Sequence, residues 1–278
     1  MERVIRGRSF TLVKTFYEDG VATDPDSPPT VAITRSDGST VTAGAVTNET
    51  PDGTWSVTVP ASSNLLLDTL TADWAAMVNG VAQEYLDVVE VAGDVLFTVA
   101  EMQAELGTST TSYTAAQIAT ARTYAETQLE RACGVAFVAR YARETFSGNG
   151  TTTVLLRWPR VTAVRSVSIG GADVTPVASV VALREGIGYL STGWTAGYGN
   201  VVIDYEHGDS VLDPGASEAA LVLAKHKLVK GPIDERATQR SSEFGPVNLA
   251  TPGMFGSRFG IPVVDAFIAA NNMNVGVA

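Results

Sequence analysis

Residues 114–134 read TAAQIATARTYAETQLERACG, and our division of the chain starts from this stretch. Thr114 and Gln117 have the spacing of a capping box, in which each side chain bonds the backbone amide of the other residue. Gly134 follows where a left-handed cap ends a helix. Apolar residues recur between them at steps of three and four, which places them on one helix face: Ile118, Ala121, Ala125, Leu129, Ala132 and Cys133. The stretch predicts a long helix with one buried face.

The other faces of this helix carry charges of both signs, from Arg122, Glu126, Glu130 and Arg131. Glu126 and Glu130 are like charges four residues apart, a spacing that does not stabilise an isolated helix. Charges of both signs can instead pair across a repeated subunit contact. We therefore predict that these four residues face a neighbouring subunit. The alternative is an ordinary core helix whose polar faces meet water.

Composition limits the class of protein. The chain has 278 residues, 45% hydrophobic and 18% charged, which is typical of a globular protein with more than one domain. A net charge of -11 argues against tight nucleic-acid binding, because too few cations are present to displace the counterions of phosphate. Cys133 is the single cysteine, so an intramolecular disulfide is impossible. We expect no signal peptide and no membrane span.

The N-terminal third, residues 1–93, alternates apolar and polar residues in short runs separated by turn residues. Asn79-Gly80 is the strongest hairpin signal among them. This pattern predicts an immunoglobulin-like β-sandwich of about seven strands. We expect Trp55 and Trp74 in its core, with a ligand platform as the alternative. Most of the net negative charge lies here, because five basic and 13 acidic residues give this segment -8 of the total of -11.

Beyond residue 93 the pattern changes to helices that flank strands. Thr98 and Glu101 form a second capping box, and Asp213-Pro214 begins another helix after several strands. The predicted fold class is α+β multidomain: a sandwich at 1–93, a helical-bundle connector with a small inserted β element at 94–232, and an extended arm at 233–278. The arm is too apolar for a free tail, and Pro262 begins a short helix in it. We predict that it docks on a partner, or else folds back on its own helices, through Phe255, Phe259, Ile261 and Phe267.

No residue pattern indicates catalysis, a cofactor or a metal. His207 and His226 have no Cys, His or carboxylate neighbours at zinc spacing, so we expect structural or surface roles. The acidic residues that follow a predicted strand lack the spacing of a known calcium site: they are Asp204, Glu206, Asp209 and Asp213. We predict that the protein is not an enzyme.

The order of the C-terminal pieces resembles a known family. The resemblance covers roughly residues 95–270 and rests on ERACG at 130–134, ETFSGNGT at 144–151, LL at 155–156, WP at 158–159, VRSV at 164–167 and VVIDYEHG at 201–208, before Pro214. These segments look like the head-to-tail connector, or adaptor, proteins of tailed bacteriophages of the siphovirus type. The N-terminal β-domain is an addition to that pattern.

The resemblance implies a structural virion protein at the neck, assembled in the host cytoplasm. Copies would form a twelve-fold ring between the portal and a downstream stopper or tail protein. Double-stranded DNA would pass through the lumen without specific binding, and an acidic surface would discourage sticking. The alternatives are another neck or tail-tube ring component, or a carbohydrate-binding surface module built on residues 1–93.

Overall fold

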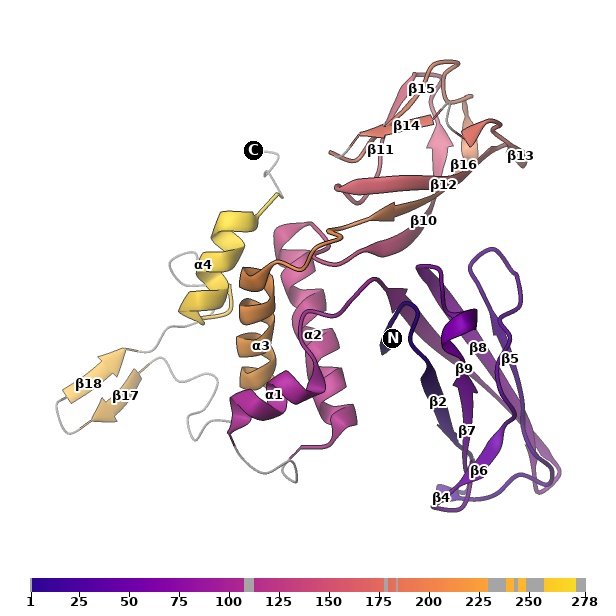
Figure 1. Ribbon diagram of the computed structural model, residues 1–278, viewed down its shortest axis with the longest axis vertical. Coiled ribbons are helices and arrows are strands. Elements are labelled where there is room, and N and C mark those ends of the chain that lie inside the picture. The colour runs from indigo at the N-terminus through magenta and orange to yellow at the C-terminus, as the bar shows by residue number, and fades with distance from the viewer. Residues whose placement is uncertain are drawn as a thin grey trace. The chain divides into compact units, whose positions relative to one another are not determined.

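The computed structural model describes residues 2–107, 113–177, 180–183, 185–229, 239–242, 245–248 and 258–273 (Figure 1). The chain forms two compact units that each draw on two separate segments. The β unit contains Met1–Val95 and Val138–Ser210, and the helical unit contains Leu96–Phe137 and Val211–Ala278. These units do not follow the boundaries predicted at residues 93 and 232, and separate folding of the predicted domains stays a prediction.

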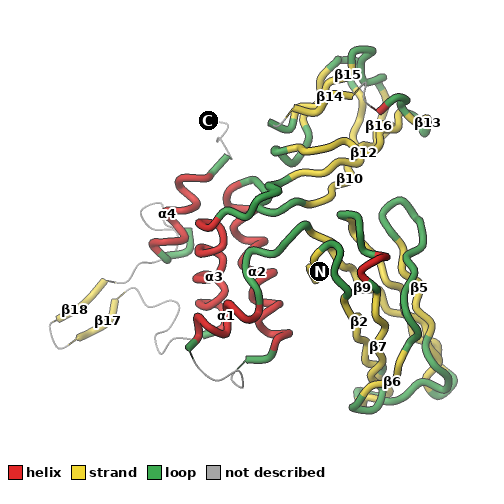
Figure 2. The backbone as a smooth tube through the Cα atoms, in the orientation of Figure 1, coloured by secondary structure: helices red, strands yellow, loops and turns green. Residues whose placement is uncertain are grey.

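The predicted fold class was wrong. The protein is mostly β, with 39% strand, 24% helix and four α-helices among the described residues, and it is not a helical-bundle connector (Figure 2). The cause lies in residues 138–210, which the sequence pattern indicated as a small insertion between helices. Their alternating apolar residues instead fill a hydrophobic core of their own around Trp194 and Tyr205. The predicted β-rich N-terminal region is confirmed.

The N-terminal sandwich, residues 2–92, has two main sheets that share one core. Its strands are β1 (Glu2–Ile5), β2 (Phe10–Thr15), β3 (Tyr17–Glu18), β4 (Val21–Ala22), β5 (Thr30–Thr34), β6 (Thr47–Glu49), β7 (Thr54–Val59), β8 (Asp68–Val78) and β9 (Val81–Ala92). One sheet has the order β1-β9-β8-β5, and the other has the order β2-β7-β6. The short β1 pairs parallel to β9, whereas the other pairs in these sheets are antiparallel.

The core of the N-terminal sandwich explains its alternating sequence. Trp74, Phe16 and Val57 are fully buried between the sheets, and Trp55 is 8% exposed, so the predicted core position of both tryptophans is confirmed. Asn79 and Gly80 both have positive φ and close the long β8–β9 hairpin, as their sequence predicts.

The second β module, residues 138–210, also has two sheets. Its strands are β10 (Arg140–Gly148), β11 (Thr153–Leu155), β12 (Val161–Ile169), β13 (Ala172–Asp173), β14 (Val180–Leu183), β15 (Ile187–Leu190) and β16 (Gly197–His207). The sheets have the orders β10-β16-β12-β13 and β11-β15-β14. Strand β16 pairs with both β10 and β12. Its alternate residues Val201, Ile203 and Tyr205 point to one face and are fully buried in the hydrophobic core.

The helical unit gathers α1 (Val99–Leu106), α2 (Ala115–Cys133), α3 (Pro214–Leu228), α4 (Pro262–Asn271) and the hairpin β17 (Gln239–Ser242) and β18 (Gly245–Asn248). Helices α2, α3 and α4 pack on one another (Figure 1). Both predicted capping boxes are present, and Gly134 ends α2 in the left-handed conformation. Across the described ranges, no helix is long and apolar enough to span a membrane.

Candidate functional site

Three of the four acidic residues considered for calcium binding, Asp204, Glu206 and Asp209, form hydrogen bonds or ion pairs within the β unit, and Asp213 caps α3. The Asp204 carboxylate accepts hydrogen bonds from the Tyr141 hydroxyl at 2.6 Å and the Ser166 hydroxyl at 2.5 Å. Glu206 pairs with Arg165, and Asp209 pairs with Arg160. In the part of the chain that the structure describes, no group of three or more His, Cys, Asp or Glu could hold a metal ion.

The two histidines differ in surroundings. His226 is exposed on α3, whereas His207 is 2% exposed at the end of β16. The His207 ring stacks on Trp158 with 5.2 Å between ring centroids and an interplanar angle of 5°. Burial, followed by the nearby Arg140 charge, lowers the pKa of His207 to about 4. His207 is therefore neutral near pH 7 and belongs to the packed interior.

The four charged residues predicted to face a neighbouring subunit do not share one environment. Glu126 is fully buried in the helical unit and accepts a hydrogen bond from the Leu96 amide at 2.8 Å. The Arg122 guanidinium donates to the Phe97 carbonyl at 3.3 Å. Glu130 is 5% exposed, while Arg131 is exposed in the last turn of α2. Glu126 and Arg122 therefore attach the segment before α1 to α2. The periodicity of residues within α2 could not indicate these contacts.

We expect Glu126→Ala to lower the free energy of unfolding by about 1–3 kcal/mol, because the buried Leu96 amide loses its acceptor. Urea denaturation followed by far-UV circular dichroism measures this change. Glu105→Ala is the matched control, since Glu105 is 43% exposed and pairs with the 41% exposed Lys225. Surface pairs of this kind contribute at most about 1 kcal/mol. Equal losses in the two variants would show that Glu126 has no special structural role.

The described end of the predicted arm lies against its own unit. Helix α4 packs on α2 and α3, and the Phe267 ring lies 5.2 Å from the Phe137 ring between centroids. The Asp265 carboxylate accepts from the amides of Arg258 and Phe259 at 2.9 Å each, which fixes the turn before α4. Phe259, Ile261 and Phe267 are each half-buried, whereas Phe255 lies outside the described residues. The structure therefore shows the alternative in which this segment folds back on its own helices, and docking on a partner stays a prediction.

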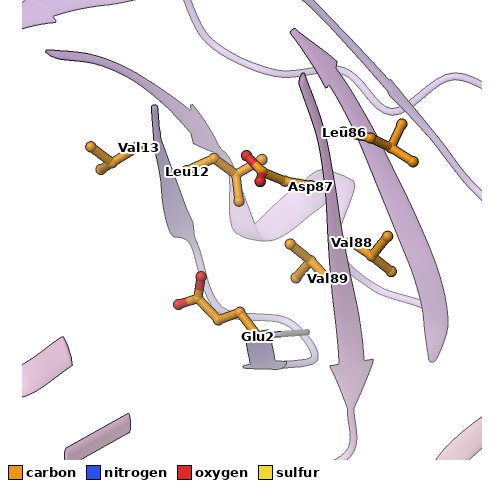
Figure 3. Close-up of a pocket in the computed structure, with 7 residues that line it drawn as sticks. All are labelled: Glu2, Leu12, Val13, Leu86, Asp87, Val88 and Val89. Carbon is orange, nitrogen blue, oxygen red and sulfur yellow. The ribbon is translucent and has the colours of Figure 1, made fainter. Parts of the chain in front are cut away.

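A shallow depression of about 550 Å³ lies between β2 and β9 on the N-terminal sandwich (Figure 3). Its lining consists of Glu2, Leu12, Val13, Leu86, Asp87, Val88 and Val89. Lys14 ion-pairs with Asp87 at 2.8 Å and links the edges of the two sheets there. The two tryptophans that could have formed a sugar platform lie in the core instead. No observation on this surface favours the carbohydrate-binding alternative.

No family model matches the chain. A maltoporin of Hahella chejuensis is 32% identical over 82 residues, which cover 29% of this chain and only 21% of the maltoporin.

Two solved structures of gene transfer agents contain similar chains. A chain from the neck of an empty particle, computed with C6 symmetry, has a TM-score of 0.47 and 15% identity, covering 66% of this chain and 93% of its own. A chain from the native virion has a TM-score of 0.44 and 16% identity, covering 64% of this chain and 89% of its own. Both TM-scores are too low to establish a shared fold.

Proposed function

We propose that this chain is a structural protein of a phage-like particle, located in the neck, where copies form a ring that joins the portal to the next neck or tail protein. The family resemblance of residues 95–270 supports this proposal. One structural observation also supports it: residues of three of the resembling segments contact one another within the second β module.

This contact cluster lies in the second β module and draws on three of the resembling segments. Glu144 of β10 accepts a hydrogen bond from the Tyr205 hydroxyl of β16 and another from the Arg157 amide at 3.1 Å. The Tyr205 oxygen in turn accepts from the Trp158 amide at 3.2 Å. Burial, then the adjacent Glu144, raises the pKa of Tyr205, so its hydroxyl stays protonated as a donor. The polar residues of the resembling segments therefore hold two strands and a loop of the second β module together.

The charge of the chain suits a position around DNA. The net charge of -11 gives the protein the same sign as phosphate. Like charge discourages binding to the DNA backbone, and a lumen that does not bind DNA lets it slide. No catalytic role is part of the proposal, and the ring of twelve copies follows from the resemblance.

Charge reversal on α2 tests the ring. We expect Arg131→Glu to reduce the fraction of assembled rings more than it lowers the melting temperature, because Arg131 is exposed in the last turn of α2. Arg122→Glu is the matched comparison, and it should lower the melting temperature as well because Arg122 bonds the Phe97 carbonyl. Native mass spectrometry and differential scanning fluorimetry measure the two effects. Undiminished assembly of the Arg131→Glu protein would remove α2 from the subunit contact.

A further inference from the structure

The N-terminal sandwich and the second β module have separate hydrophobic cores, and hydrogen bonds and an ion pair join them. One core surrounds Trp74 and the other surrounds Trp194. The Arg165 guanidinium donates to the Leu67 carbonyl at 2.6 Å across this junction. The Gly93 amide also crosses it, donating to the Ala139 carbonyl at 2.7 Å. Because each module has its own core, these polar contacts can break while both modules stay folded.

A second series of side-chain hydrogen bonds crosses the same junction. The Ser36 hydroxyl donates to Asp68 at 2.6 Å and lies 2.7 Å from the Tyr141 hydroxyl. Tyr141 in turn donates to Asp204 of the second β module at 2.6 Å. Burial, then the hydrogen bond to Asp204, raises the pKa of Tyr141 to about 12, so this donor persists over the ordinary pH range.

The centre of the junction is a buried ion triad. The Glu90 carboxylate of β9 accepts from Arg3 of β1 at 2.9 Å and from Arg140 of β10 at 2.5 Å. The three side chains are at most 9% exposed. Burial by itself would raise the pKa of Glu90, but the charges of Arg140 and Arg3 outweigh it and lower that pKa. Glu90 therefore stays ionised, and its ion pair with Arg140 links the two modules.

His207 lies beside this triad. It pairs in register with Arg140, and its buried Nδ1 atom has no hydrogen-bond partner. A proton on this ring would place a second positive charge beside Arg140 in a buried position, which is costly. The charged and titratable groups around the ring are Arg140 on β10, Glu90 on β9, Arg3 behind Glu90, Tyr205 and Glu206 on β16, and the Arg160–Asp209 pair beside Gly208.

We propose that this junction is an acid-sensitive latch: proton uptake at His207, reinforced at lower pH by Glu90, releases the N-terminal sandwich from the second β module. Separation brings water to His207 and Arg140, so both can be charged there. Each module keeps its own core and remains folded. Above neutral pH the latch is closed, and the two modules act as one body.

Proton linkage determines how the stability of the closed junction changes with pH. His207 has a pKa of about 4 in the closed junction against an ordinary value of 6.5, so the closed form gains stability that is complete above pH 6.5 and is lost as pH falls toward 4. The lowered pKa of Glu90 acts in the same direction below its ordinary 4.5. With these His207 values, the open population rises about twentyfold between about pH 8 and about pH 5.2. The lower pH is above the isoelectric point of about 4.6, where the chain keeps a net negative charge.

Amide hydrogen exchange on the full chain tests the latch, because the Gly93 amide bonds across the junction. After correction for intrinsic rates, we expect the Gly93 protection factor to fall about twentyfold between about pH 8 and about pH 5.2. Amides in the central strands β8 and β16 should keep their protection. His207→Gln should abolish most of the fall at Gly93, whereas His226→Gln, the matched control at the exposed histidine, should behave like the unaltered chain.

A second variant keeps the test independent of His207. Glu90→Gln removes the carboxylate that both arginines contact, so Gly93 protection should already be reduced at about pH 8. Three outcomes would overturn the proposal: a Gly93 protection factor that does not change with pH, an equal fall in the His207→Gln protein, or a parallel fall in β8 and β16. The last outcome would mean general acid unfolding.

Discussion

Replacing Glu90 with alanine should lower the free energy of unfolding of the β unit by up to about 3–5 kcal/mol, because the closed junction then keeps Arg3 and Arg140 buried without their shared carboxylate. Glu90 is 6% exposed, and each of its oxygens accepts from a different guanidinium. Urea denaturation followed by tryptophan fluorescence measures the loss, since all four tryptophans lie in this unit.

Glu84→Ala is the matched control, because Glu84 is an exposed glutamate on the same strand, β9. A surface change of this kind should stay within about 0.5 kcal/mol. The triple variant Arg3→Met, Glu90→Leu, Arg140→Met separates the effect of the buried charges on stability from the effect of side-chain packing. Apolar groups in place of a whole buried ion cluster are often neutral or stabilising, so we expect the triple variant to recover most of the loss. Failure to recover it would mean that the junction depends on the shape of these side chains.

Trp194→Ala should lower the free energy of unfolding of the second β module by about 3–5 kcal/mol, because Trp194 is fully buried in its core. The indole packs edge-on against Phe146 at 5.7 Å between ring centroids and donates to the Thr152 carbonyl at 3.2 Å. Removal leaves a cavity between the strands and the segment that links β15 to β16. The measurement is thermal unfolding by circular dichroism.

Tyr198→Ala provides the control for this variant, four residues further along the chain. The Tyr198 side chain is fully exposed, so its removal should change stability by no more than about 0.5 kcal/mol. A similar melting temperature for the Trp194→Ala and Tyr198→Ala proteins would contradict the packing described for this core.

Local signals predicted the helices and hairpins well, because the relevant contacts lie within a few residues. The Thr98 and Thr114 capping boxes, the Asp213 cap and the Asn79-Gly80 turn were all predicted from sequence and are present. Alternation of residue types also predicted the N-terminal sandwich and the burial of its tryptophans. These features depend on backbone geometry that nearby side chains determine.

Features that depend on distant segments were not predictable in the same way. Glu126 was predicted to face a neighbouring subunit, or else water, but residues 96–97 cover that side of α2 and the Leu96 amide donates to its carboxylate. The ion triad joins strands separated by 87 and 50 residues, and the sequence gives no sign of that pairing. The extent of the second β module was underestimated because its core joins residues far apart in the sequence, such as Phe146, Trp194 and Tyr205. The failure of the predicted fold class has the same cause.

Mass photometry of the purified full chain tests the proposed ring most directly. Each subunit has a mass of 29.1 kDa, so closed rings appear as a discrete species at a fixed multiple of that mass. We expect this species, alone or after addition of the cognate portal, with a multiple near twelve. A chain that stays monomeric at all concentrations and with portal present would contradict the account.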